Sequence, residues 1–377
     1  MSVSEKIDNA ETEDRPEEEG RPRPRPATIY DVAELAGVSI KTVSKVINNL
    51  PQVSYATRQR VSEAVETLSF RPNQLARGLA SSRSFMLGLF CDAPAAGSGY
   101  AARIQMAMLT MCHNEGYHLI VECVHATNPQ VGRQVNALVA QSSLAGVLLM
   151  PPLSDVPALI AALKHTKTPI VRFSPGTAES DVIDVDIDNC AAARDMTNYL
   201  IGLGHRRIGF VRGPLYHGDA VMRFEGYRLA LAAAGIAFDE DLCADGDYTY
   251  KTGMRAGEQL LSLPERPSAI FASNDDMAAG VMAASLRFNL RIPQDLSVAG
   301  FDNEIISHAM SPRLTTCHQP IAEMAEAAFF AIIRQNKKHA GTFHLPHKIV
   351  VRGSTAAPGM AGVDNDDNEA PTPFFNG

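Results

Sequence analysis

Residues 28–48 constrain the fold of this chain more than any other stretch, because they have the pattern of two short helices joined by a glycine. Apolar residues at spacings of three and four indicate one continuous apolar side of the first helix: Ile29, Val32, Ala33 and Ala36. Gly37 can adopt the left-handed conformation that ends a helix. Ser39 then suits the N-cap of a second helix, since its hydroxyl can accept a hydrogen bond from a free backbone N–H.

The second helix has two sides of different chemistry. Val43, Val46 and Ile47 are predicted to face the first helix. The residues left facing outward are mostly small, polar or cationic: Ile40, Lys41, Ser44, Lys45 and Asn48. This arrangement indicates a helix-turn-helix, and the alternative is an ordinary helical hairpin with a polar face.

Residues 28–48 closely resemble the DNA-binding headpiece of the lactose-repressor (LacI/GalR) family, which typically reads T-[IL]-x-D-V-A-x-x-A-G-V-S-x-x-T-V-S-x-V-[IL]-N. A third helix, capped by Ser54, is expected to complete an all-α headpiece over residues 28–71. The resemblance implies that Ile40, Lys41 and Lys45 read base edges in the major groove. It also implies phosphate contacts from Tyr30, Ser39, Thr42, Asn48, Thr57 and Asn73.

The net charge of -8 at first argues against a nucleic-acid partner. The charge is unevenly distributed, however, because residues 37–60 contain four lysines and arginines and no acid. The local field at the second helix is therefore positive, which is compatible with a double-stranded DNA operator.

A hinge helix and linker are expected over residues 72–84. A segment this short is marginal as an isolated helix, and Gly78 weakens it further. In the resembled family this hinge folds when two subunits meet on DNA, and a leucine from each enters the minor groove. By that resemblance the leucine is Leu79, which would unstack a base step and bend the duplex.

From Phe85 the pattern changes to short apolar runs that alternate with helical stretches. Strands are expected near residues 86–91, 118–124, 146–150 and 169–173, and in a second series near 207–212, 268–272 and 296–301. Such alternation predicts α/β lobes with parallel sheets covered on both faces. The two series resemble the two-lobed type I periplasmic-binding-protein fold, assigned to residues 85–353, with chain crossings between the lobes near residues 187, 318 and 348.

Three polar residues follow strands or begin a helix in the second series: Arg223, Asn274 and Asp302. Ligands of open parallel sheets bind at the carboxyl ends of the strands, and an arginine, an amide and a carboxylate suit a small polyol or sugar. The resemblance implies three further effector contacts. Tyr248 is an aromatic platform against a ligand ring, and Tyr100 and Gln319 contact the effector from the opposite lobe. Ser174 stands where several sugar-responsive family members have an aspartate. This difference leaves the identity of the sugar open, and also whether the effector is a sugar.

The two ends of the chain, residues 1–27 and 354–377, are expected to be disordered tails because they are polar and rich in Pro, Asp or Glu. The second tail has no leucine and so no heptad seam, which favours a homodimer over a tethered tetramer. No signal peptide or membrane-length apolar run is present, so a cytoplasmic protein is expected rather than a secreted solute-binding protein.

The sequence contains no candidate set of catalytic residues. Gly97-Ser-Gly-Tyr-Ala-Ala102 imitates a dinucleotide fingerprint, but five residues separate it from the preceding strand. The histidines and six cysteines lack metal-ligand spacing, so no metal and no cofactor are expected. The resemblance therefore implies a DNA-binding transcriptional regulator, commonly a repressor in this family and not an enzyme, that is controlled by a small sugar-like effector. The residues decide neither repression against activation nor whether the effector releases DNA or promotes binding.

Overall fold

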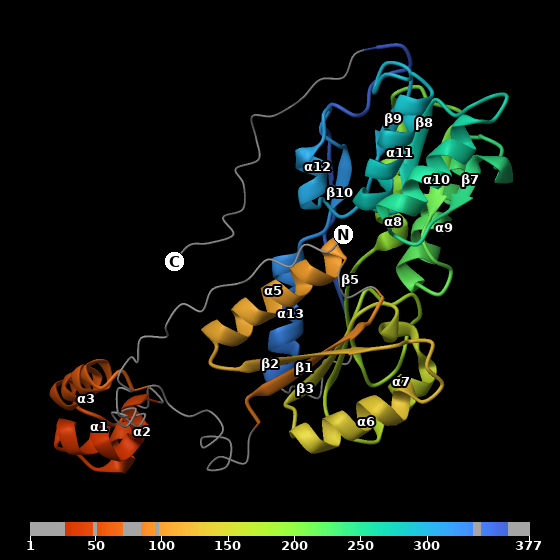
Figure 1. The fold of residues 1–377 in the computed structure, drawn as a ribbon. Coiled ribbons are helices and arrows are strands. Elements are labelled where there is room, and N and C mark those ends of the chain that lie inside the picture. Colours follow the sequence, from red (N-terminus) through yellow and green to blue (C-terminus); the bar gives the residue numbers. More distant parts are fainter. Residues whose placement is uncertain (1–26, 48–50, 71–83, 95–97, 335–340, 361–377) are drawn as a thin grey trace, which may run out of the picture. The chain divides into compact units, whose positions relative to one another are not determined.

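The computed structural model describes residues 27–47, 51–70, 84–94, 98–334 and 341–360. The chain forms two compact units, residues 1–77 and 78–377, drawn together in Figure 1. We refer to the described parts of the first unit as the headpiece and of the second as the sensor.

The headpiece contains three helices, α1 (Ile29–Ala36), α2 (Ile40–Ile47) and α3 (Tyr55–Thr67). The N-termini are capped as the sequence predicts: the backbone N–H of Thr42 donates to Ser39 Oγ at 3.2 Å, and that of Thr57 donates to Ser54 Oγ at 3.3 Å. Gly37 has φ +62° and ends α1. A capping box at Thr28 and Asp31, not predicted, begins α1.

The inner sides of these helices form one small apolar core. Val32, Val43 and Val61 are fully buried, one from each helix. Ala33, Ala36, Val46, Ala64 and Phe70 complete the cluster. The predicted three-helix headpiece is confirmed. Only the apolar side of α2 is needed for this small core, so its polar side remains available to solvent.

The first lobe of the sensor is built on a six-stranded parallel sheet with the order β11-β5-β4-β3-β1-β2. Helices α5 and α13 pack on one face of this sheet, and α6 and α7 pack on the other. The strands are β1 (Met86–Asp92), β2 (His118–Val124), β3 (Gly146–Leu149), β4 (Ile170–Phe173), β5 (Ile183–Ile187) and β11 (Gly341–Leu345). The helices are α5 (Gly99–Asn114), α6 (Val131–Ser142), η1 (Leu153–Asp155), α7 (Pro157–Lys164) and α13 (Ile321–Ile333).

The second lobe has a four-stranded parallel sheet with the order β7-β6-β8-β9. Helices α8 and α9 cover one face, and α10 and α11 cover the other. The strands are β6 (Ile208–Arg212), β7 (Cys243–Asp245), β8 (Ala269–Ala272) and β9 (Ser297–Ala299). The helices are α8 (Asn189–Gly202), α9 (Gly218–Ala233), η2 (Glu240–Leu242), α10 (Tyr250–Leu261), α11 (Asp275–Arg287) and α12 (Ile305–Ala309).

The chain passes between the two lobes at the three places that the sequence predicted. It leaves β5 for α8 near residue 187, leaves β10 (Thr316–His318) for α13, and leaves β11 for β12 (Lys348–Val350). Strands β10 and β12 pair antiparallel. The sensor also continues past the expected boundary at residue 353, because Ser354, Thr355 and Ala356 are buried.

Helices α10 and α11 approach each other closely through two glycines. A Cβ on Gly280 would overlap the backbone of Tyr250 and Met254, and one on Gly253 would overlap the backbone of Met277. Both obstructions are backbone atoms, which cannot rotate away as a side chain can.

We therefore expect Gly280→Ala to lower the free energy of unfolding of the sensor by about 1–3 kcal/mol, despite the better helix propensity of alanine. Urea denaturation of the full chain measures this effect. Gly202→Ala is the matched control, because nothing lies within 4 Å of a Cβ at that helical position; an equal loss in both variants would contradict the close-approach explanation.

Candidate functional site

The start of α2 presents the residues that the sequence assigned to base reading. Lys41 is exposed, and Ile40 is 38% exposed although it is apolar. Lys45, one turn later, donates from Nζ to Gln52 Oε1 at 3.3 Å. Ile40, Lys41 and Lys45 thus form a solvent-facing side of α2, opposite buried Val43 and Val46.

The residues expected at phosphates occupy the ends of the same helices. Tyr30 in α1 is 68% exposed, and Ser39 and Thr42 are hydrogen-bonded to each other at 2.9 Å. Thr57 lies in the first turn of α3. Asn48, Asn73 and Leu79 fall outside the described residues.

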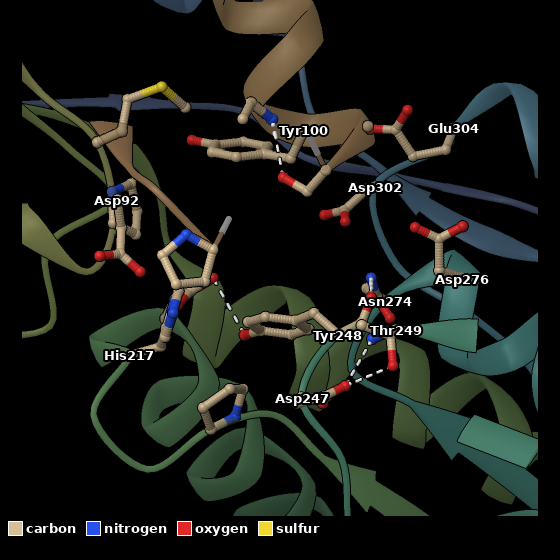
Figure 2. A pocket seen from close by; sticks show the side chains of 18 of the residues that line it. Asp92, Tyr100, His217, Asp247, Tyr248, Thr249, Asn274, Asp276, Asp302 and Glu304 are labelled. Atoms are coloured by element: carbon tan, nitrogen blue, oxygen red, sulfur yellow. Dashed lines mark hydrogen bonds and ion pairs between the residues drawn. The ribbon is translucent and has the colours of Figure 1, made fainter. Parts of the chain in front are cut away.

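A cavity of about 530 Å³ lies between the two lobes of the sensor. Figure 2 shows polar side chains from both lobes pointing into it. Its walls come from the loop after β1 and the start of α5 in the first lobe, and from the starts of α9, α10 and α11 in the second. Five of the seven predicted effector residues line it: Tyr100, Arg223, Tyr248, Asn274 and Asp302.

Arg223 of α9 is the only arginine among the described residues that line this cavity, and it is buried. Its Nε donates to Asn189 Oδ1 at 2.9 Å and its Nη1 donates to the carbonyl of Ser273 at 2.6 Å. The guanidinium carbon lies 3.8 Å from the centroid of the Phe301 ring. These contacts hold the guanidinium rigidly and leave Nη2 directed toward carboxylates.

Two carboxylates face Nη2 of Arg223, Asp219 at 3.4 Å and Asp302 at 3.6 Å. Asp302 also accepts a hydrogen bond from Gln319 Nε2 at 2.6 Å. Its φ of +107° is unusual for a non-glycine residue and stores local strain. Gln319, predicted from the opposite lobe, does not itself line the cavity but contacts Asp302, which does.

Tyr248 lies across the cavity floor with φ +68°. Its hydroxyl donates to Asp219 Oδ2 at 3.2 Å, and its ring makes an edge contact with His217 at 5.3 Å between centroids. Asn274 donates to the Tyr248 carbonyl at 3.0 Å and also caps α11. A hydrogen bond therefore joins Asn274, the predicted amide, to Tyr248, the predicted aromatic platform.

The first lobe contributes Tyr100 and, behind it, Ser174. The Tyr100 hydroxyl and Ser174 Oγ are 3.1 Å apart. Ser174 is 1% exposed and does not line the cavity. Ser174 therefore contacts Tyr100 from outside the cavity, and burial raises the pKa of the Tyr100 phenol, which keeps it protonated.

The carboxyl groups around the cavity differ in acidity. Burial raises the pKa of Asp302 to about 6, against the lowering effect of Arg223. Burial, and then the charge of Asp302, raises the pKa of Glu304 to about 7. For Asp219, burial opposes ionisation, but Arg223 and then His217 outweigh it and bring the pKa to about 2.

Several acids that were not predicted from the sequence also line the cavity: Asp92, Asp219, Asp247, Asp276 and Glu304. Asp219 lies four residues before Arg223, which is the spacing of neighbours on a helix, so this pair could have been found. The others are single carboxylates in loops or at helix starts, a position where acids are common for helix capping alone.

Two family models match the chain, the bacterial regulatory proteins of the lacI family over residues 28–73 and the periplasmic binding protein-like domain over residues 197–355. The chain is 32% identical to catabolite control protein A of Priestia megaterium, covering 87% of this chain and 99% of the relative. It belongs to the LacI family of transcriptional regulators. This membership confirms the predicted regulator, as opposed to an enzyme, and the predicted two-lobed sensor.

The chain is also similar to other transcriptional regulators and repressors. The ribose operon repressor of Escherichia coli K12 is 35% identical over 82% of this chain and 93% of its own length. The lac repressor dimer bound to operator and the anti-inducer ONPF superposes with a TM-score of 0.73 at 27% identity, covering 88% of this chain and all of that one. A complex of the regulator CelR with cellobiose has a TM-score of 0.65 at 31% identity, over 87% and 99% of the two chains.

Within the described residues, no helix is both long enough and apolar enough to span a membrane, and no group of three or more His, Cys, Asp or Glu is placed to hold a metal.

The raised pKa of Glu304 predicts a pH-dependent stability of the sensor. The folded state holds the proton more tightly than the unfolded chain, so the penalty for ionising Glu304 is absent below about pH 4.5, grows with pH and is complete above about pH 7. Glu304→Gln should therefore be more stable than the parent at pH 8, by up to about 3 kcal/mol, and close to it at pH 5.

Urea denaturation at pH 5 and at pH 8 measures this difference. Glu265→Gln, at an exposed position, serves as the control and should show no pH-dependent gain. A Glu304→Gln variant that loses stability at pH 8 would show that the pairing with Arg103, 3.5 Å away, outweighs burial.

Proposed function

We propose that this LacI-family repressor acts as a homodimer on a roughly palindromic DNA operator, and that a small sugar or sugar derivative in the interlobe cavity controls its DNA affinity. The observation that carries the effector assignment is the cavity itself. Arg223, Asp302 and Asn274 present hydrogen-bonding groups from one lobe, and Tyr100 faces them from the other.

A polyhydroxylated ring fits this arrangement. A guanidinium supplies donors, a carboxylate supplies acceptors and an amide supplies both, so each can fix one or two hydroxyl groups. Tyr248 offers an aromatic face beside them. The names of two relatives, a ribose operon repressor and a regulator complexed with cellobiose, support a sugar-like effector here.

The solved lac repressor is a dimer on its operator, which supports the same assembly for this chain. A two-fold protein reads two-fold DNA, with one headpiece in each half-site. In this arrangement Ile40, Lys41 and Lys45 meet base edges, while Tyr30, Ser39, Thr42, Asn48, Thr57 and Asn73 meet phosphates. Leu79 is the proposed minor-groove wedge.

Effector and DNA are coupled because the cavity is lined by both lobes. A ligand that contacts both lobes favours one lobe arrangement by its differential affinity, and this arrangement alters how the paired hinges meet DNA. The coupling is reciprocal and typically amounts to about 1–3 kcal/mol. The proposal is tested by measuring operator binding with and without sugars that raise the melting temperature of the purified protein.

Arg223→Lys should lower effector affinity at least tenfold and leave operator binding without effector nearly unchanged. Lysine preserves the positive charge near Asp219 and Asp302, so the buried carboxylates stay compensated, but it cannot reproduce the guanidinium fork. Calorimetric titration with the effector, together with operator binding by fluorescence anisotropy, checks both parts. A variant that responds at the same effector concentration would place the effector elsewhere.

Lys41→Ala should weaken operator binding by about 1–3 kcal/mol and relax the preference at one base position, because a base contact carries sequence information. Tyr30→Phe is the comparison, since loss of a phosphate contact should weaken all sequences alike. Anisotropy titrations against the operator and single-base variants distinguish the two. A uniform loss in Lys41→Ala would move this residue from base reading to the phosphates.

A further inference from the structure

The interlobe cavity is strongly acidic. Apart from Arg223, His217 and Cys91, the charged and titratable side chains that line it are acids or tyrosines, and no lysine is among the described lining residues. The carboxylates are Asp92, Asp219, Asp247, Asp276, Asp302 and Glu304. The positive charge of Arg223 is already compensated, because Asp219 and Asp302 face its guanidinium. The cavity therefore presents a negative potential to a ligand.

Four helices begin at the cavity, and protein carboxylates already occupy the start of each. Helix N-termini attract anions, so they would otherwise be phosphate sites. Asp219 lies in the first turn of α9, and Asp275 and Asp276 lie in the first turn of α11. Asp247 accepts a hydrogen bond from the backbone N–H of Thr249, the N-cap of α10, at 3.0 Å.

The fourth helix, α5, has no acid in its own first turn. The carboxylate of Glu304 reaches it from the other lobe and lies directly against Gly99, where a Cβ would overlap it. A phosphate at any of these four helix starts would therefore meet a carboxylate instead of free N–H groups.

Three of the acids, Asp276, Asp302 and Glu304, gather on one side of the cavity (Figure 2). Glu304 is 7% exposed, and its Oε1 has no hydrogen-bond partner. Among the described residues, the cation paired with that oxygen is Arg103, 3.5 Å away, whose Nη1 also donates to the carbonyl of Asp302 at 2.9 Å. This side of the cavity thus has acceptor capacity that the protein itself does not use.

We propose that the cavity selects its effector by charge: it takes an uncharged polyol, binds an amine-bearing analogue at least as tightly, and rejects phosphorylated and carboxylated sugars. An ammonium group would find Glu304 and Asp276 as acceptors. A phosphate would add two negative charges beside carboxylates in a partly buried site, where like charges repel strongly. The inference rests on the proposed function, since it names the class of effector for the same cavity.

Matched sets of sugars test the selection on the full-length protein at pH 7.5. Each set contains a hexose, its 2-amino derivative and its 6-phosphate, for glucose and for galactose, with affinities measured by calorimetry. In any set that binds, the 6-phosphate should bind at least tenfold more weakly than the hexose, and the amino sugar at least as tightly as the hexose. A 6-phosphate that binds as well as its hexose overturns the charge selection while leaving the sugar effector intact.

The double variant D276N/E304Q should reduce the discrimination against the 6-phosphate at least threefold. The control E115Q/E265Q removes the same charge from two exposed positions outside the cavity and should retain the discrimination. Equal effects in both double variants would show that the net charge of the protein, and not the cavity, repels the anion, and would overturn the proposal.

If no sugar of either set binds, glucose and galactose are excluded as effectors, and a second measurement decides the charge selection separately. Thermal shifts are compared for Tris, a polyhydroxylated amine, and for inorganic phosphate, in the parent and in D276N/E304Q. Tris should stabilise the parent more than the variant, and phosphate should stabilise the variant more than the parent. The reverse order, or no difference between the two proteins, overturns the proposal.

Discussion

The effector side of this protein depends on one buried cation. Arg223 lies almost out of contact with solvent, and the uncompensated burial of a guanidinium would be prohibitively unfavourable. Its compensation comes from separate parts of the second lobe: Asn189 begins α8, Ser273 follows β8, and Asp302 follows β9. The network therefore fixes the ends of strands and helices relative to one another, and the cavity is the space these ends leave open.

The same network accounts for local strain beside the cavity. Asp302 and Tyr248 both have positive φ values, which are unfavourable for residues with a side chain. Each is held by more than one contact: Asp302 by Gln319 and by a backbone bond to Cys317, and Tyr248 by Asp219 and Asn274. Strain of this kind persists only where surrounding contacts over-determine the conformation.

The sequence predicted strands that are dominated by apolar residues and missed a strand in which acids alternate with apolar residues. Strand β1 was predicted as a continuous apolar run, whereas β5 alternates with acids and was not. Its Asp184 is paired with fully buried Arg172, twelve residues away, and such compensation is invisible without the fold. Likewise, only the structure shows that Asp276 lines the cavity while its neighbour Asp275 is fully buried and accepts a hydrogen bond from Thr316.

The acidity of the cavity and the contact between the lobes meet in one short segment, residues 302–304. Arg103 of the first lobe donates to the carbonyls of Asp302 and Asn303 and faces the carboxylate of Glu304, so this segment joins the lobes. Asp302 and Glu304 also face the ligand space, and burial disfavours their charges there. A ligand that supplies donors to these carboxylates relieves an unfavourable interaction at the point where the lobes touch. Ligand binding in the cavity and the contact between the lobes then involve the same few atoms, which is what the proposed coupling of effector to lobe arrangement requires.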